Sequence, residues 1–367
     1  MLKHAKTMML LVCPVFFIAS AETARSDTHV KEDNTERSFL VSDYEQRAIS
    51  GDVSAQLALG FLYRGSASFG RNDEESVKWF RMAAEQGNAE AQVRIGDAYF
   101  HGTAVTQSDS EALSWYQKAA EQGHPLGLAF LAEMHEFGYG TEENQESAIE
   151  FYQAAGDQAP LWAQIRLAVL LVFGDSSEEE RQLAIETLIF ASDLGDAEAQ
   201  NNLGVVHHRG LGVPVNYAEA EKWYRKAAEQ GDALAQNNLA RMHETGTGVP
   251  VNYTVAEKWY RMAAEQGYDI AQNNLRWMHE IGAGVPIDYL EAEKWYRKAA
   301  KQGYGLAQRN LAQMYVMKSR MWMQIAKTNG FQEESLRTDR LGPSRTIDRS
   351  VTAKLAQQCI ASEYEDC

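Results

Sequence analysis

The chain has 367 residues and a formal charge of −16, with 51 acidic against 35 basic side chains. Hydrophobic residues make up 45% and charged residues 23%, a composition typical of globular proteins that excludes wholesale disorder. The acidic balance argues against nucleic acid or anionic lipid as a main partner, and three cysteines are too few for a disulfide-dense or multi-cysteine zinc protein.

The first 21 residues have the pattern of a secretory signal peptide. Two lysines precede an apolar run over residues 8–18, and the small residues at 19–21 offer a cleavage site. The run is too short for a helix that spans a bilayer, and Cys13 lacks the small residue that precedes the cysteine of a lipoprotein signal. We therefore expect export to the periplasm or beyond, with cleavage near Ala21, and no membrane span further along the chain.

A polar segment over residues 22–38 follows, which predicts a flexible leader, and residues 39–50 are expected to form a capping helix. From residue 51 a 36-residue period organises the chain. Glycines share one register, with Ala159 filling the missing place: Gly51, Gly87, Gly123, Gly195, Gly231, Gly267 and Gly303. We predict seven full units over residues 51–302 and a shortened eighth over 303–330, together 51–330.

Each unit predicts two helices. In the fifth, Ala199, Leu203 and His207 recur at helical spacing, and a second stripe contains Trp223 and Tyr224. A Gly-x-Gly pair ends the first helix, since glycine adopts a positive φ without strain. One register of small polar residues predicts the N-caps of the second helices: Asn72, Ser108, Asn144, Asn216, Asn252 and Asp288. A single helix pair cannot bury its apolar face alone, so the pairs are expected to stack into an all-α solenoid.

At these motifs the sequence resembles the Sel-1-like repeat, a relative of the tetratricopeptide repeat. The resemblance rests on Ala-x-Ala-Gln-x₂-Leu-Gly, Gly-x-Gly-Val and Ala-x₂-Trp-Tyr-Arg-Lys-Ala-Ala-Glu-Gln-Gly, as in residues 197–231. It implies an α/α superhelix that acts as an adaptor in assembling complexes, and many bacterial members are exported. The third and fourth units depart from the pattern, with Gly127 at the small-residue position and Thr187-Leu188 in place of the aromatic pair.

Three patterns that could suggest chemistry have simpler structural interpretations. His135, His207, His243 and His279 share one register, but equivalent residues of adjacent repeats lie about 8–10 Å apart, too far to bind one metal ion. The Gly-x-Gly pairs follow no strand and lack a third glycine or a Gly-Lys-Ser/Thr sequence, so they do not indicate a phosphate site. No serine or cysteine lies in a catalytic motif. We therefore expect no cofactor, metal or catalytic residue.

The outward arc of the first helices is the expected binding surface. In related superhelices this arc lines the concave face, and here two tryptophans outside the repeat framework fall on it, beside apolar residues and a polar row. Apolar anchors flanked by amide and guanidinium groups suit a peptide-binding groove, although the same residues could pack within the superhelix. The candidate partner-binding residues are Trp162, Leu234, Ile270, Asn201, Asn237, Asn273, Arg309, Arg241 and Trp277.

Residues 331–367 are expected to form a C-terminal cap. Apolar residues at helical spacing end at Cys359, eight residues before Cys367. In an oxidising compartment these two cysteines would close a disulfide loop, and otherwise they are free thiols.

The leading hypothesis is an exported, non-enzymatic scaffold that binds a protein or peptide, in envelope regulation or host interaction. The alternative is an envelope enzyme acting on cell-wall or β-lactam compounds, as proposed for cysteine-rich relatives, although the repeats here contain no cysteine. A third possibility is a purely structural spacer without a saturable partner.

Overall fold

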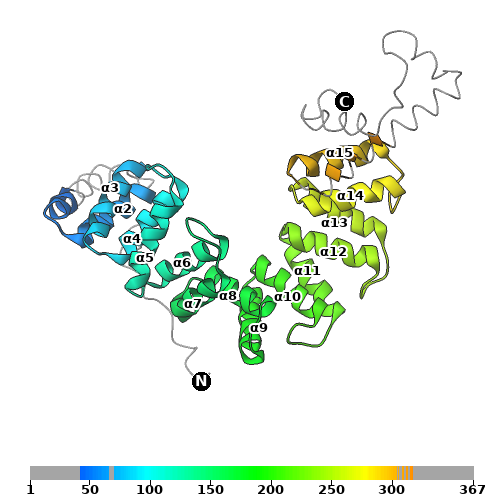
Figure 1. Ribbon diagram of the computed structural model, residues 1–367, viewed down its shortest axis with the longest axis horizontal. Helices are drawn as coiled ribbons and strands as arrows, with labels where there is room; N and C mark the ends of the chain where they lie inside the picture. Colours follow the sequence, from blue (N-terminus) through cyan, green and yellow to red (C-terminus); the bar gives the residue numbers. More distant parts are fainter. Residues whose placement is uncertain are drawn as a thin grey trace, which may run out of the picture. The chain divides into compact units, whose positions relative to one another are not determined.

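The computed structural model describes residues 42–65 and 70–303, and beyond them residues 305, 308, 309, 311, 312, 315 and 316. This part of the chain is helical and contains no strand, which confirms the expected all-α fold (Figure 1). The signal peptide, the leader, the C-terminal cap and its two cysteines, and most of the shortened eighth repeat lie outside the described residues. Of the expected capping helix, residues 42–49 are helical.

The chain divides into two compact units, Met1–Pro160 and Leu161–Cys367. The first contains the helix at 42–49 and three helix pairs: α2 (Val53–Gly65) with α3 (Asp73–Glu85), α4 (Ala89–His101) with α5 (Asp109–Glu121), and α6 (Pro125–Phe137) with α7 (Gln145–Ala155), followed by the 3₁₀ turn η2 (Gly156–Gln158). We number these pairs repeats 1 to 3. Each of these helices packs on the next one along the unit.

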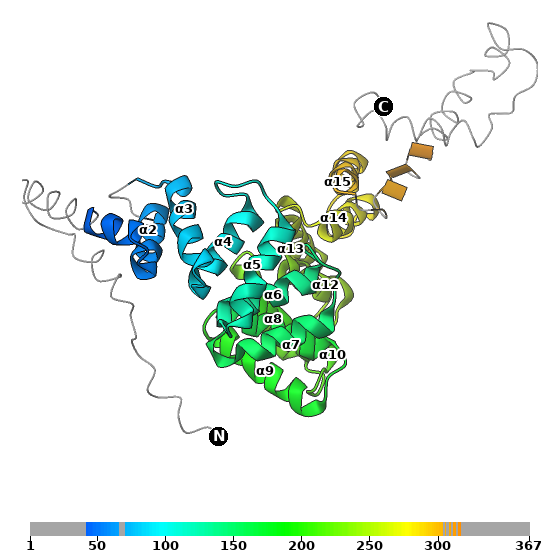
Figure 2. The same ribbon diagram turned by 60° about the vertical axis from the view of Figure 1, so that its left-hand side comes forward.

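The second unit contains four described pairs, repeats 4 to 7. They are α8 (Leu161–Phe173) with α9 (Glu178–Asp193), α10 (Ala197–Arg209) with α11 (Tyr217–Glu229), α12 (Ala233–Thr245) with α13 (Tyr253–Glu265), and α14 (Asp269–Ile281) with α15 (Tyr289–Lys301). Successive helices again pack on one another, so the pairs form a stack (Figure 2). None of the helices in the described ranges combines the length and apolar composition needed to cross a bilayer.

The predicted N-caps are confirmed at all six positions. Each side chain accepts a hydrogen bond from a backbone N–H in the first turn of its second helix, as Asn216 does from Glu219 N at 3.2 Å. This bond satisfies one of the backbone donors that a helix N-terminus leaves free. At the other boundary, Gly210, Gly246 and Gly282 end the first helices with φ of 72°, 75° and 77°.

Small residues and large rings share the core between the helices of a pair. Leu239, Tyr260 and Leu275 are fully buried in one cluster that runs through repeats 5 to 7. Gly204 of α10 faces Tyr224 of α11, and a Cβ added at Gly204 would lie 2.6 Å from the Tyr224 ring. The glycine is therefore needed because the two helices approach closely at an aromatic side chain.

Paired glutamines connect three helices in each regular repeat. Gln236 of α12 is buried and donates from Nε2 to Ala228 O of the preceding repeat, at 3.1 Å. Its Oε1 accepts from Gln266 Nε2 at 2.9 Å, at the end of the second helix of its own repeat. The same double link is formed by Gln56 with Gln86, Gln92 with Gln122, Gln200 with Gln230 and Gln272 with Gln302. In repeat 4 the position of Gln230 is occupied by Leu194.

Candidate functional site: the exposed face of the first helices

The first helices of the second unit expose one continuous arc, which we call the first-helix face. Its residues recur at i, i+4, i+7 and i+11 along each helix, a spacing that places them on one side. The face consists of Trp162, Arg166, Val169 and Phe173 on α8; Glu198, Asn202, Val205 and Arg209 on α10; Leu234, Asn238, Arg241 and Thr245 on α12; and Ile270, Asn274, Trp277 and Ile281 on α14, none of which is buried.

Apolar side chains of α12 and α14 remain accessible on this face. Leu234 is 42% exposed, Ile270 38% and Ile281 51%. Trp277 is half-buried and packs against the core cluster of repeats 5 to 7, so its ring is held in place while part of it faces solvent. Trp162 at the other end is also half-buried. A ring fixed by its own core is suited to act as an anchor, because little side-chain entropy is lost when a partner covers it.

Two arginines lie in the middle of the face without a charged partner. Arg209 and Arg241 are exposed, and neither makes an ion pair or a side-chain hydrogen bond with any described residue. Both guanidinium charges reach the same two rings. Burial is the main cause that lowers the pKa of His208, and the two guanidinium charges lower it further. Burial raises the pKa of Tyr224, and the same two charges partly offset that rise. Both cations are therefore near enough to these rings to act on them, and a carboxylate is the group that an unpaired guanidinium binds best.

The charges at the edges of the face are already neutralised. Arg166 of α8 pairs with Glu198 of α10 at 3.2 Å, and Arg276 of α14, which is buried beside the face, pairs with Glu280. The contrast with Arg209 and Arg241 is informative, because an exposed pair contributes little to recognition whereas a free guanidinium provides a directional donor for a carboxylate.

The expectation that Asn201 and Asn237 face outward is wrong. Their side chains are only 2% and 5% exposed, and their Oδ1 atoms accept hydrogen bonds from Asn238 Nδ2 at 3.0 Å and Asn274 Nδ2 at 3.3 Å. The physical reason is their place on the helix, one residue short of the exposed arc, which directs them toward the next first helix. They join adjacent repeats instead of offering a surface.

Most other predicted site residues lie at the surface. Leu234, Ile270 and Arg241 are exposed on the face, and Trp162 and Trp277 are partly exposed there. Asn273 is half-buried and accepts a bond from Arg276 Nη2 at 3.4 Å, and Arg309 is exposed. Sequence reasoning missed Arg209, Ile281 and the asparagine row at 202, 238 and 274. The i, i+4, i+7, i+11 spacing from Glu198, carried to the other first helices by the 36-residue period, would have located all of them.

The histidine register has a structural role in the described repeats. The carbonyls of His135, His207, His243 and His279 accept the backbone N–H of the following N-cap residue at 2.8–2.9 Å. Burial lowers the pKa of His135, His207 and His243. Within the residues that the structure describes, no three histidine, cysteine or carboxylate side chains gather as a metal site would require.

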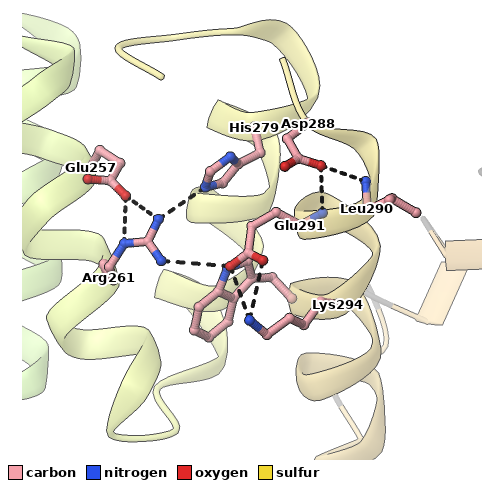
Figure 3. Close-up of polar contacts among 8 residues, drawn as sticks. Glu257, Arg261, His279, Asp288, Leu290, Glu291 and Lys294 are labelled. Atoms are coloured by element: carbon pink, nitrogen blue, oxygen red, sulfur yellow. Dashed lines mark hydrogen bonds and ion pairs between the residues drawn. The ribbon is translucent and has the colours of Figure 1, made fainter. Parts of the chain in front are cut away.

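The last of these histidines belongs to a polar network between repeats 6 and 7 (Figure 3). Arg261 pairs with Glu257 through Nε at 2.7 Å, approaches His279 Nε2 at 3.3 Å through Nη2, and lies 3.7 Å from Glu291 through Nη1. Arg261 therefore contacts one member of each of the three helices or helix ends that meet here.

Glu291, at the start of α15, is a second acidic member of this network beside Glu257. Burial alone raises the pKa of Glu291, but the hydrogen bond and charge of Lys294, together with the Trp295 indole N–H at 2.9 Å, outweigh burial and lower it. The network thus joins α13, α14 and α15 by charges that are satisfied locally, and it stabilises the stack without forming an open site.

Comparisons with known proteins agree with this architecture. A family model described as the Sel1 repeat matches residues 53–88, 89–124, 125–160, 197–232, 233–268 and 269–304. It leaves out repeat 4, which nevertheless forms the helix pair α8 and α9. No curated protein matches the chain.

Similar solved structures include two Sel1 repeat proteins. A protective antigen of uropathogenic Escherichia coli with an SLR fold is 34% identical over 75% of this chain and 59% of its own, with a TM-score of 0.57. This chain therefore spans less than two thirds of the length of that antigen. A Sel1 repeat protein from Oxalobacter formigenes is 27% identical over 66% of this chain and 96% of its own, with a TM-score of 0.58.

Proposed function

Because the chain belongs to the Sel1 repeat family, we propose that it is a non-enzymatic scaffold that binds a protein or peptide across the first-helix face of repeats 4 to 7. Proteins of this family typically serve as protein-interaction scaffolds. The observation that carries the proposal is the pair Arg209 and Arg241, two exposed guanidinium groups without a charged partner among the described residues. They lie in a chain of charge −16, in which other arginines, among them Arg225 and Arg297, are paired with carboxylates.

The chemistry of the face defines the partner segment. Leu234 lies two helical turns from Arg241 on α12, and Trp277 occupies the same register as Arg241 on the next first helix. Adjacent helices pack about 8–10 Å apart, so the cation and the ring are close enough to contact one short peptide. The expected ligand carries a carboxylate, from Asp, Glu or a C-terminus, with apolar side chains on either side of it.

Selection of peptides from a random displayed library on the immobilised full chain tests this function. We expect enriched sequences that combine acidic and apolar residues, and at least tenfold weaker binding to Arg241→Glu, measured by fluorescence anisotropy. Lys301→Glu on α15 is the matched control, because it makes the same charge change at an exposed position away from the face. Equal weakening by both variants would show that only the net charge matters and would overturn the proposal.

The enzyme alternative has a separate readout. Incubation of the purified chain with cell-wall fragments and β-lactam compounds, followed by mass spectrometry, is expected to show no turnover. Turnover that survives Arg241→Glu would replace the scaffold assignment with a catalytic one.

We further propose that the chain acts after export, on the strength of the apolar run over residues 8–18 and the small residues that follow it. N-terminal sequencing of the protein recovered from the cell envelope and the medium tests this. A mature form that begins at Glu22 is expected, and an unprocessed cytoplasmic form would refute it.

A further inference from the structure

Helix α9 of repeat 4 presents an apolar stripe to solvent. Leu183 is 64% exposed, Phe190 57% and Leu194 62%, and their spacing of seven and four residues places all three on one side of the helix. A fourth apolar residue, Ile189, is 41% exposed nearby. Such a contiguous exposed patch in a folded protein marks an interaction site more often than isolated apolar residues do.

Repeat 5 shows that the stripe is not a requirement of the fold. The equivalent positions of α11 hold Glu219 for Leu183, Lys226 for Phe190 and Gln230 for Leu194. Both helices pack inward in the same way. The inner side of α9 is filled by its own buried residues, which include Ile185 and Leu188, and α9 packs on α8 and α10 (Figure 1). The outward apolar residues therefore add nothing to the core of the second unit.

Acidic side chains without a counter-charge border this stripe. Glu179, Glu186 and Asp193 lie on one edge of it, between the stripe and Ile189, and none of them makes an ion pair or a side-chain hydrogen bond with a described residue. The single cation of α9, Arg181, lies elsewhere and pairs with Glu178 at 3.3 Å.

Repeat 5 again provides the contrast. Where α9 has Glu186 and Phe190, α11 has Lys222 and Lys226, so the outer side of this helix has exchanged its cations for an acid and an aromatic ring. An acid also occurs at this position in α7, as Glu150, but without the stripe, so α9 is distinguished by the apolar stripe and the acidic border together. Both changes occur on the same surface, and together they define what can cover it.

We infer that α9 is a second docking surface, which binds a positively charged amphipathic helix of a partner protein. Apolar residues spaced three or four apart would cover Leu183, Phe190 and Leu194, and flanking Lys or Arg side chains would pair with Glu179, Glu186 and Asp193. A second copy of this chain is disfavoured, because stacking two α9 surfaces would place six carboxylates together. An anionic membrane is disfavoured for the same reason.

The α9 surface differs from the first-helix face in its position and in the sign of its unpaired charges. It lies on a second helix, it contains no free guanidinium group, and it selects a basic segment where the first-helix face selects an acidic one. The two sites therefore predict opposite peptide preferences in one chain, and variants at one are expected to leave the other unchanged.

The test uses the full chain and three synthetic 14-residue peptides with leucine at the same helical positions. Their remaining positions are Lys, Gln or Glu. By isothermal titration we expect saturable binding of the Leu/Lys peptide, at least tenfold weaker binding of the Leu/Gln peptide, and none of the Leu/Glu peptide. Binding of the Leu/Lys peptide should weaken as salt is raised, because the partner charges are exposed.

Two variants restore residues of repeat 5 and so are expected to fold. F190K/L194Q removes two of the three apolar anchors, and Glu186→Lys reverses one of the three charges of the border. Each variant should weaken binding of the Leu/Lys peptide at least tenfold. Leu290→Gln is the matched control, since it removes an apolar side chain that is 76% exposed on another helix, and it should bind as the unmodified chain does. Circular dichroism checks that each variant retains its helical content.

Several outcomes would overturn the inference. Unchanged binding by F190K/L194Q would show that the peptide binds the net negative charge elsewhere, and absence of saturable binding to the unmodified chain would reject the site. Light scattering tests for self-association: a dimer that F190K/L194Q converts to a monomer would assign the α9 surface to a second copy of the chain. Loss of binding to Arg241→Glu would merge this site with the first-helix face.

Discussion

The glutamine links make a quantitative prediction about how repeats are joined. Replacing Gln236 by Met keeps the volume of the buried side chain while removing its amide. Two hydrogen bonds disappear, one to Ala228 O at 3.1 Å and one from Gln266 Nε2 at 2.9 Å. A net contribution of about 0.5–1.5 kcal/mol per bond predicts a loss of about 1–3 kcal/mol in the free energy of unfolding.

For Gln236→Met we expect a loss in the lower half of that range, because neither former hydrogen-bond partner is left unsatisfied. Ala228 O keeps a second donor, Gly231 N at 3.1 Å, and the exposed Gln266 amide can be hydrated once its partner is gone. Neither group is therefore left as a buried atom without any partner. Gln266→Ala has a comparable expected cost of about 1–2 kcal/mol, because it leaves the buried Gln236 Oε1 without its donor.

A double-mutant cycle isolates the bond between the two glutamines. Urea unfolding of the chain, Gln236→Met, Gln266→Ala and the double variant is followed by circular dichroism, and the slopes are compared because repeat proteins can unfold in steps. We expect a coupling energy of about 0.5–1.5 kcal/mol. Glu265→Ala, an exposed neighbour, controls for helix propensity. Strict additivity of the two changes would refute the structural role assigned to the pair.

Three further predictions concern single residues and are measured by the same urea titration. Gly248→Ala should lower the free energy of unfolding by about 1–3 kcal/mol more than Gly231→Ala does. Both glycines have a positive φ, but only a Cβ at Gly248 would collide with Tyr217, at 2.1 Å. Equal losses for the two variants would contradict this reasoning. Burial lowers the pKa of His135, so the contribution of the neutral ring to stability is complete above about pH 6.5 and is lost as the pH falls below that value. His135→Tyr should therefore flatten the decline in the free energy of unfolding between pH 7.5 and 5.5. An unchanged pH profile would reject this account. Asn252→Ala should cost about 1 kcal/mol and Asn252→Asp much less, since aspartate also caps a helix; similar losses would exclude capping as the cause.

The sequence was sufficient to predict the helix pairs, their N-caps and the glycine termini, because these features recur in most repeats and depend on local chemistry. Asn216 caps its helix through a bond to a residue three positions away, so no tertiary information is needed. The same holds for the pair Glu257 and Arg261, at 2.5 Å on one helix.

The asparagine row shows where sequence reasoning fails. Asn201 and Asn202 are adjacent and identical, yet Asn201 is 2% exposed and its neighbour is half-buried. The difference depends on where the next first helix lies, and that placement follows from packing between repeats. The glutamine links were missed for the same reason, since Gln236 bonds to residues 8 and 30 positions away.

A repeat protein separates the residues that build the stack from those available for binding. Positions such as Gln236, Gly248 and Asn252 must satisfy the same contacts in each regular repeat, so a substitution there destabilises the fold. Exposed positions have no such constraint, and there the chain can depart from its own period freely, as it does with Phe190 where α11 has Lys226. An exposed aromatic ring contributes nothing to stacking and increases the risk of aggregation, so its presence is explained by a surface that becomes covered. Departure from the repeat at an exposed position is therefore a stronger indication of binding than agreement with it.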